Sequence, residues 1–321
     1  MLYLSERDLL TIGIDWHETV SVIERAVRCL DRGDFAQPIK PYLRYRDPTN
    51  RIIAMPAFVG GDCNAAGLKW IASFPRNIDR GIPRAHSVVV LNDADTGAPF
   101  SIINGALLSV VRTASVSGLM LLRYDQARPR REINVGIAGF GPIGRRHLDM
   151  CMALLGPRLR RATIYDVRPV DLHAERPLPD SVVLARSWQE AYDDADVFIT
   201  CTVSPAAYID RPPKPGSLQL NVSLRDYTTA VYDHVKAGIL VDDWDEVCRE
   251  ATDIEVFHKE RGLAQGDVKT IADAVCRDEL ERYAPDQPIM FNPMGMAVFD
   301  IATARHFHQK AIASGVGTPL G

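Results

Sequence analysis

The 321-residue chain is long enough for about two domains, and 46% hydrophobic and 24% charged residues are typical of a soluble protein. A net charge of −4 argues against nucleic-acid binding, and six scattered cysteines without a CxxC pair argue against a zinc site or a disulfide framework. The N-terminal residues do not have the pattern of a signal peptide, and no apolar run approaches the ~18 residues that cross a bilayer. We therefore expect a cytoplasmic protein that binds neither nucleic acid nor a membrane, with no metal site.

The first third of the chain predicts a helix and then an antiparallel sheet. Asp15, with Glu18 three residues later as in a capping box, begins a helix that ends near Gly33. A second helix is expected from about residue 105 to residue 124. Between the two helices, turn residues separate three strand-like runs: 51–55, 67–71 and 87–91.

A polar linker at residues 125–131 precedes a change of pattern. Strand 133–138 and helix 143–155 begin an alternation that is typical of a doubly wound parallel sheet, so we predict an α/β fold. Two arginine clusters, at 128–131 and 158–161, are expected to be solvated. The later predicted strands are 161–165, 197–202, 218–222 and 238–241.

A glycine motif joins the first strand of this second part to its helix. Gly139, Gly141 and Gly144 have the spacing that allows a tight turn, backbone contact with a pyrophosphate and close helix packing. Asp166 follows Gly144 by about 20 residues, where a carboxylate binds the ribose diol and repels a 2′-phosphate. The motif therefore predicts an NAD site, although Arg168 leaves NADP open. A glycine-rich turn in an unrelated α/β protein is the alternative.

Further polar residues have two interpretations each. Thr202 and Ser204 follow a parallel strand and are either cofactor contacts or ordinary loop residues. Arg44, Lys69 and Arg112 are either surface charges or part of a substrate site, and Lys69 alternates with apolar neighbours on a predicted strand. His306 and His308 are two residues apart on a predicted helix and do not share a face, so they are rejected as a metal pair.

These residues lie in blocks through which the chain resembles the ornithine cyclodeaminase/mu-crystallin family. The blocks cover nearly the whole chain in order: Met55-Pro56, Gly67–Lys69, Leu91–Pro99, Arg112–Ala114, the glycine motif, Asn221…Asp226 and Gly295…Asp300. Longer strings are most similar to the siderophore-pathway dehydrogenases that release 2,3-diaminopropionate: Gln37–Arg44, Arg51–Pro56, Gly67–Ile71, Val241–Trp244 and Asn292–Met296.

The resemblance implies an architecture: residues 1–125 with 300–321 form a discontinuous α+β domain for substrate binding and dimerisation, and 126–299 form a Rossmann-type NAD-binding domain. The C-terminal helix, from about Pro293, would pack on the first domain, and the protein would be a homodimer. The implied cofactor contacts are Thr113, Gly139, Gly141, Pro142, Ile143, Gly144, Asp166, Thr202, Ser223 and Met294.

The resemblance also implies site residues and a reaction. Arg44, Arg84 and Arg112 would bind substrate carboxylates, Lys69 would bind a carboxylate or polarise the attacking water, and Asp226 would hold the amine and order water. A helix or turn cap is the alternative role for Asp226. NAD+ would take hydride from the glutamyl α-carbon of N-(1-amino-1-carboxy-2-ethyl)glutamate. Water would then cleave the imine to 2-oxoglutarate and L-2,3-diaminopropionate.

Two departures from the ornithine cyclodeaminases argue against proline formation. Ile53 stands where those enzymes carry a glutamate, and residues 226–230 lack their Asp-x-Pro-Gly-Lys continuation. Ornithine or lysine cyclodeaminase, alanine dehydrogenase and ketimine reductase are the alternative activities. A non-catalytic, crystallin-like binding protein is the alternative of another class, although it need not keep Lys69, Arg112 and Asp226.

Overall fold

The computed structural model describes residues 1–174 and 176–321, which form two compact units. Unit 1 comprises residues 1–115 and 295–321, and unit 2 comprises residues 116–294. The sequence placed these boundaries at residues 125/126 and 299/300. The first boundary falls instead inside helix α3 (Gly105–Ala127), which continues through the first part of the expected linker.

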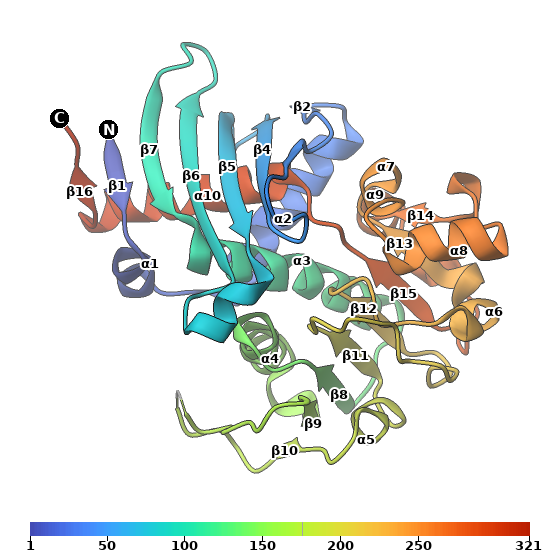
Figure 1. Ribbon diagram of the computed structural model, residues 1–321. Coiled ribbons are helices and arrows are strands. Elements are labelled where there is room, and N and C mark those ends of the chain that lie inside the picture. Colours follow the sequence, from blue (N-terminus) through green and yellow to red (C-terminus); the bar gives the residue numbers. More distant parts are fainter. Residues whose placement is uncertain (175) are drawn as a thin grey trace. The chain divides into compact units, whose positions relative to one another are not determined.

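Unit 1 is built on a mixed sheet with the strand order β16-β1-β7-β6-β5-β4-β2, and β3 also pairs with β4. The strands β4 to β7 are antiparallel, as expected, and Figure 1 shows them side by side. The strand β1 pairs with β7 in parallel. The strands are β1 (Leu2–Leu4), β2 (Phe35–Ala36), β3 (Tyr42–Leu43), β4 (Arg51–Val59), β5 (Ala65–Ser73), β6 (Ala85–Asp93), β7 (Pro99–Asn104) and β16 (Thr318–Pro319).

Helices cover one face of this sheet. The helices α1 (Glu6–Ile12) and α2 (Trp16–Asp31) lie between β1 and β2 in the sequence, and α10 (Ala297–Ser314) contacts β4, β5, β6 and α2. The C-terminal helix therefore packs on the N-terminal unit, as the resemblance implied. Asp15 caps α2 as expected, whereas the side chain of Glu18 binds Lys310 of α10.

The face of the sheet toward α10 contains one charged residue in an otherwise apolar row. In register across β4, β5, β6 and β7 lie Met55, Lys69, Val89 and Ile103, and all four are buried. Alternation along a strand puts every second side chain on the same face, so Lys69 is directed to the helical side with its apolar neighbours. A lysine in such a row requires a buried partner.

Unit 2 is an eight-stranded parallel sheet with helices, as the alternating pattern predicted. Its strand order is β10-β9-β8-β11-β12-β15-β13-β14, and its strand pairs are parallel. The strands are β8 (Ile133–Ala138), β9 (Leu159–Tyr165), β10 (Val182–Leu184), β11 (Val197–Thr200), β12 (Leu218–Asn221), β13 (Ile239–Val241), β14 (Lys269–Thr270) and β15 (Ile289–Asn292). The α-helices are α4 (Pro142–Leu155), α5 (Trp188–Tyr192), α6 (Tyr232–Val235), α7 (Trp244–Val247), α8 (Asp253–Arg261) and α9 (Ile271–Cys276).

The order of strands creates a switch point between β8 and β11. From β8 the chain proceeds through β9 to β10 in one direction, and then through β11 and β12 in the other. At such a point the loops after neighbouring strands diverge and leave room for a ligand at the carboxyl edge. The loops after β8, β9, β11, β12 and β15 carry six of the ten predicted cofactor residues, and the start of α4, directly after the β8 loop, carries three more.

The expectation of solvated arginine clusters was wrong in part, and the expectation that no apolar run is long enough to cross a bilayer was wrong as to length and composition. Arg128 donates to the carbonyls of Gly216 and Gln287, and Arg158 forms a bidentate pair with Asp125, so these two side chains are paired and partly buried. Arg131, Arg160 and Arg161 are exposed, as expected. Helix α3 is long and apolar enough to cross a membrane by length and composition, but 72% of its most apolar window is buried inside the protein. It is therefore best described as a core helix.

Candidate functional site

Three charged side chains meet in the core of unit 1. The Nζ of Lys69 lies 3.0 Å from Oδ1 of Asp300, and the Nε of Arg112 lies 2.9 Å from the same oxygen. Lys69 also donates to Oγ of Ser109 at 2.8 Å. Lys69 and Asp300 are inaccessible to solvent or nearly so, and Arg112 is 7% exposed. One carboxylate oxygen from α10 thus orients a cation from β5 and a cation from α3.

A fourth charged group, Lys40, adds to the positive charge near Lys69. Lys40 is buried, and its Nζ donates to the carbonyl of Gly295 at 2.9 Å. The pKa of Lys69 is lowered to about 8: burial lowers it most, Arg112 and Lys40 also lower it, and Asp300 opposes these effects. Burial raises the pKa of Asp300, but Arg112 and Lys69 outweigh this effect and hold it below its usual value. The cluster therefore keeps an excess of positive charge that suits an anionic ligand.

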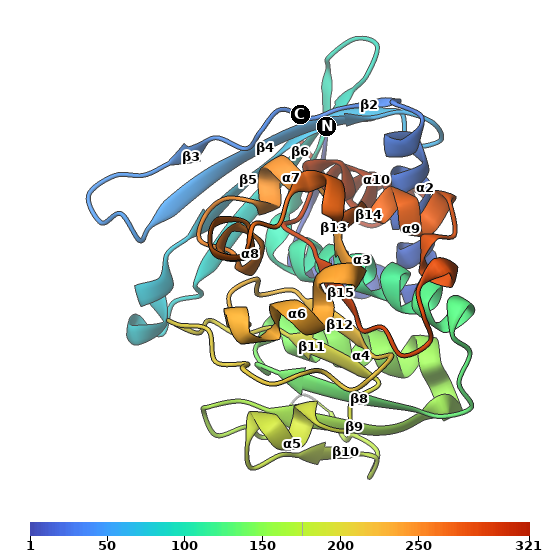
Figure 2. The same ribbon diagram turned by 90° about the vertical axis from the view of Figure 1, so that its right-hand side faces the viewer.

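The other two predicted substrate arginines lie outside this cluster. The strand β3 forms a hairpin with β4 (Figure 2). Arg44 follows β3, is exposed, donates to the carbonyl of Pro48 at 2.8 Å and lies over the ring of Tyr42. Arg84 precedes β6, where its carbonyl accepts from the N–H of Phe74 at 2.9 Å. The strand pairing places Leu43 opposite Ile52, three residues and about 10 Å along β4 from the Met55–Lys69 pair.

The glycine loop of unit 2 has the geometry of a dinucleotide site. Gly139 has a φ of +89°, which other residues rarely adopt, and a Cβ there would lie 2.5 Å from the backbone of Cys201. A Cβ on Gly144 would lie 2.1 Å from the carbonyl oxygen of Gly139, whereas one on Gly141 would meet nothing within 4 Å. Only at the middle glycine is the backbone open to a phosphate.

The first turn of α4 completes the loop. Gly141 is the N-cap residue, and Pro142 and Ile143 follow it in the first turn. Neither Gly141 nor Pro142 gives this terminus a capping side chain, so its N–H groups can bind an anion. The residues present therefore fit a pyrophosphate, as the sequence predicted.

Asp166 is placed by the same loop. Its Oδ2 accepts from the N–H of Phe140 at 2.8 Å and its Oδ1 accepts from the N–H of Arg168 at 3.0 Å. Burial raises the pKa of Asp166, but the hydrogen bonds from Arg168 and Phe140 outweigh it and keep the pKa below the usual value. The carboxylate is thus ionised at neutral pH, and each oxygen keeps a lone pair for a ribose hydroxyl. Arg168 is largely exposed, with its Nε 3.4 Å from Asp166.

Asp226 is held by two hydroxyl groups that the sequence assigned to the cofactor. Thr202, which follows β11, donates to Oδ1 of Asp226, and Ser223, which follows β12, donates to Oδ2. Asp226 is fully buried. The structure thus brings together three predicted site residues at the carboxyl ends of two neighbouring strands, with the two hydroxyls orienting the carboxylate.

The remaining predicted contacts have other hydrogen-bond partners in the structure. The hydroxyl of Thr113 donates to the carbonyl of Ser109 within α3, at 2.8 Å. Met294 follows β15, and its N–H donates to Oδ1 of Asp242 at 3.0 Å. The hydroxyl of Ser204 donates to the carbonyl of Ala206 at 2.5 Å, as an ordinary loop residue does.

Sequence reasoning gave no role to several residues that organise these sites. Asp300 and Lys40 lie inside blocks that resemble the family. Lys69 on an apolar strand was the signal for Asp300, because a buried lysine requires an anionic partner. Asn221 and Asn292 end the adjacent strands β12 and β15, and Nδ2 of Asn221 donates to Oδ1 of Asn292 at 2.8 Å. Polar residues at successive strand ends were the signal for this network.

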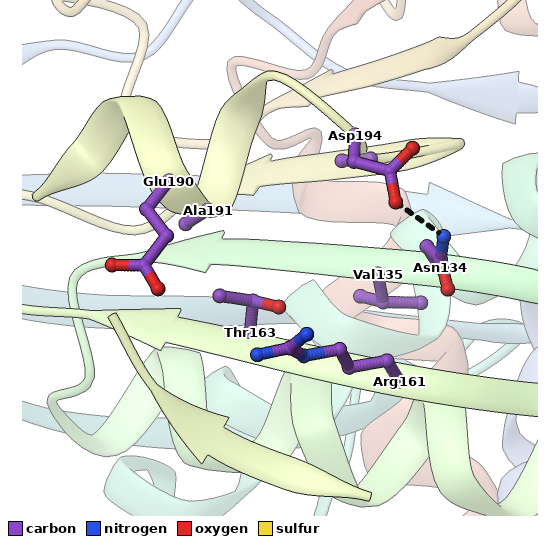
Figure 3. A pocket seen from close by; sticks show the side chains of 8 residues that line it. Asn134, Val135, Arg161, Thr163, Glu190, Ala191 and Asp194 are labelled. Carbon is purple, nitrogen blue, oxygen red and sulfur yellow. Dashed lines mark hydrogen bonds between the residues drawn. The ribbon is translucent and has the colours of Figure 1, made fainter. Parts of the chain in front are cut away.

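A shallow hollow elsewhere in unit 2 contains none of the predicted site residues. Figure 3 shows it beside β8, β9 and α5, where Asn134 donates to Asp194 at 2.9 Å. Its other lining residues include Arg161, Thr163 and Glu190. Across residues 1–174 and 176–321, no group of three His, Cys, Asp or Glu side chains could hold a metal ion.

The fold and the loop of unit 2 define the class. A glycine loop at the switch point of a doubly wound parallel sheet, followed by a carboxylate that is hydrogen-bonded to that loop after the second strand, is the site of a Rossmann-type dinucleotide-binding protein.

Comparison with known proteins gives the family. The family model described as "Ornithine cyclodeaminase/mu-crystallin family" matches residues 10–315, and the chain belongs to this family. It is 32% identical to the N-((2S)-2-amino-2-carboxyethyl)-L-glutamate dehydrogenase of Staphylococcus aureus, over 100% of this chain and 98% of the relative. It is 25% identical to the alanine dehydrogenase of Archaeoglobus fulgidus, over 99% and 98%.

A solved structure confirms the fold. The Δ1-pyrroline-2-carboxylate reductase of Thermococcus litoralis, in complex with NADH and L-proline, matches with a TM-score of 0.86 at 23% identity and covers 100% of both chains.

Substitution of Gly144 tests the dinucleotide site. We expect Gly144→Ala to raise the Kd for NADH roughly tenfold, equivalent to ~1.4 kcal/mol, because the added methyl group would displace the Gly139 carbonyl and the loop. NADH fluorescence titration measures this. Gly266→Ala is the matched control, since a Cβ there meets nothing within 4 Å. Equal affinities for the two variants would contradict the assignment.

Proposed function

We propose that this protein catalyses the NAD-dependent oxidative cleavage of N-((2S)-2-amino-2-carboxyethyl)-L-glutamate to L-2,3-diaminopropionate and 2-oxoglutarate. The protein is an NAD-dependent oxidoreductase that acts on the CH–NH group of an amino-acid substrate. The observation that carries the proposal is the buried Lys69–Asp300–Arg112 cluster of unit 1, in a chain 32% identical over its full length to a dehydrogenase named for this substrate.

The cations of unit 1 suit the charge of the substrate. The substrate carries three carboxylates, and a guanidinium binds a carboxylate with two parallel hydrogen bonds. Arg112 uses its Nε for Asp300, which leaves its terminal nitrogens on the other side of the guanidinium for a ligand. Lys69 is fixed by two acceptors and has a third proton to donate. We assign Arg44 and Arg84 to the outer carboxylates of the same substrate.

Unit 2 holds the cofactor. Gly139, Gly141 and Gly144 with the first turn of α4 would bind the pyrophosphate, and Asp166 would bind the adenosine ribose and select NAD. Bound NAD+ accepts the hydride. We also assign Thr113 and Met294 to the cofactor, as the family resemblance implies.

The reaction needs a group that holds an amine and a water molecule. Oxidation removes a hydride from the glutamyl α-carbon and a proton from its nitrogen, which leaves a C=N bond. Water adds to that carbon, and cleavage of the C–N bond returns diaminopropionate and a keto acid. Asp226 suits both tasks, because its orientation is fixed by Thr202 and Ser223 and each oxygen keeps a second lone pair.

The other activities of the family fit this chain less well. Ile53 and the segment after Asp226 depart from the cyclodeaminase pattern. Relatives named as pyrroline-carboxylate reductases are 20–22% identical, against 32% for the aminocarboxyethyl-glutamate dehydrogenase. We place the product, diaminopropionate, in siderophore or antibiotic biosynthesis, and the enzyme in the cytoplasm.

We further propose that the protein is a homodimer that pairs through the outer face of the unit 1 sheet. On this face, opposite α10, the side chains of β4 and β5 are apolar and at least partly exposed, as are Val88 and Val90 of β6, and Trp70 is 40% exposed. His86 and Asn92, toward the two ends of β6, are the polar residues of this face. Ala54, Trp70 and Val88 lie in one register row across the three strands. An exposed apolar sheet face of this kind is typical of an interface. The archaeal alanine dehydrogenase, 21% identical with a TM-score of 0.80, was solved as a dimer with bound NAD.

The reaction is tested by offering NAD+ and the glutamate–diaminopropionate adduct. We expect NADH and 2-oxoglutarate to form in equal amounts from the adduct, and neither NADH nor proline to form from ornithine. A cyclodeaminase, which recycles its hydride, would instead form proline from ornithine without net NADH. Asp226→Asn should bind NADH normally and lower kcat by about 100-fold, a typical contribution of a general base. Unchanged turnover would remove Asp226 from the mechanism, and NADH formation from alanine alone would make the chain an alanine dehydrogenase.

The ionisation of Lys69 tests its role as a carboxylate-binding group. With a pKa of about 8, Lys69 is charged at pH 7 and largely neutral at pH 9.5, so kcat/KM for the anionic substrate should fall as the pH rises through 8. Lys69→Arg, which stays charged, should lack this inflection, while Lys236→Arg on the surface should keep it. An inflection that persists in Lys69→Arg would assign it to another group.

The dimer is tested by charge at the centre of the apolar face. Trp70→Glu should convert a dimer to a monomer in analytical ultracentrifugation, because two buried glutamates would oppose each other across a two-fold interface. Ile312→Glu is the control, since Ile312 is 62% exposed on α10. A wild-type monomer, or a Trp70→Glu dimer of unchanged affinity, would contradict this interface.

A further inference from the structure

The loop that carries Asp226 has an unusual conformation. It follows β12 and includes Leu224, which has a φ of +63° although it is not glycine. The left-handed backbone conformation costs free energy for a leucine, so other contacts must hold the loop in place. Oδ1 of Asn221 supplies one of them by accepting from the N–H of Leu224 at 3.1 Å.

Asp253, the first residue of α8, supplies the others. Its Oδ2 accepts from Nδ2 of Asn221 at 2.9 Å, from the N–H of Asp226 at 3.2 Å and from the N–H of Tyr227 at 3.3 Å. Its own N–H donates to the carbonyl of Leu224 at 2.8 Å. Asp253 is 3% exposed. One carboxylate oxygen thus gathers three donors from residues 221–227 and fixes both ends of the loop.

We propose that Asp253 is the positioning residue for Asp226: its Oδ2 sets the backbone of residues 221–227 so that the Asp226 carboxylate points to its reaction partner. This inference rests on the proposed function for the role of Asp226, but the hydrogen bonds that carry it do not. Asp253 does not itself touch substrate or cofactor in this assignment.

A structural role alone does not account for this carboxylate. The start of α8 is already capped by Thr252, whose Oγ1 accepts from the N–H of Glu255 at 3.1 Å, so Asp253 is not needed as the cap. A second carboxylate near Asp226 is unfavourable: burial raises the pKa of Asp253 to about 7, Asp226 raises it as well, and the bond from Asn221 opposes both effects. Burial of a second carboxylate costs free energy, and the three hydrogen bonds that Asp253 accepts offset this cost.

The experiment compares substitutions of Asp253 that remove or keep its acceptor oxygen with a control substitution at Thr252. Asp253→Ala removes the acceptor, Asp253→Asn keeps an acceptor oxygen, and Thr252→Ala weakens the start of α8 without touching the loop. We expect Asp253→Ala to lower kcat for adduct cleavage by ~100-fold, as a displaced reacting group does, with the KM and the Kd for NADH unchanged. Asp253→Asn should restore most of kcat, and Thr252→Ala should keep the wild-type value.

Hydrogen exchange gives a readout that is independent of the reaction. The amide protons of Asp226 and Tyr227 should exchange faster in Asp253→Ala than in Asp253→Asn or Thr252→Ala. If Asp253→Ala does not fold, Asp253→Ser, whose shorter side chain cannot reach all three donors, takes its place. The proposal is overturned if these amides stay protected, or if Thr252→Ala lowers kcat as much as Asp253→Ala.

The same series separates this inference from the proposed function. If Asp226→Asn keeps full turnover, the proposed role of Asp226 fails, whatever the exchange rates. If Asp226→Asn loses turnover and Asp253→Ala keeps it, the role of Asp226 stands and the positioning role of Asp253 is overturned.

Discussion

One buried oxygen organises the charged core of unit 1. Oδ1 of Asp300 binds both Lys69 and Arg112, where the sheet packs against α10 mainly through apolar side chains. Two cations cannot be buried there without it, because breaking a buried ion pair costs about 3–5 kcal/mol. Asp300 lies 188 residues after Arg112, so this interaction explains why the C-terminal helix must return to the N-terminal unit. The excess of positive charge that remains is what an anionic substrate would neutralise.

In unit 2 the predicted site residues are brought together by the strand order of the sheet, whereas in unit 1 Lys69 and Arg112 are brought together by ion pairs. Parallel strands end at one edge of the sheet, and in unit 2 the loops at that edge carry the glycine turn, Asp166, Thr202 and Asp226. Thr202 follows β11, and Ser223 and Asp226 follow the neighbouring strand β12. Hydrogen bonds from Thr202 and Ser223 to Asp226 hold these loop residues together. Fixed dipoles and a fixed carboxylate need little reorganisation when charge moves in the reaction.

Much of this could be predicted from the sequence, because it is encoded locally. Strand alternation predicted β4, β5 and β6, and the glycine spacing with Asp166 predicted the nucleotide loop. The end of α3 was placed too early, because Asp125 is polar but binds Arg158, a partner 33 residues away. The strand β15 was missed, because four buried residues between two prolines have no periodicity. Asp300 and Asp253 had no assigned role, because their partners are distant in the sequence and meet only in the folded chain.

The central claim is that Lys69 and Arg112 bind a carboxylate of the substrate in an NAD-dependent oxidation. The most direct measurement is a crystal structure of the enzyme with NADH and 2-oxoglutarate. The account predicts one carboxylate of the keto acid within hydrogen-bond distance of both Nζ of Lys69 and the terminal nitrogens of Arg112. A keto acid bound elsewhere, with the Lys69–Asp300–Arg112 cluster closed and free of ligand, would contradict it.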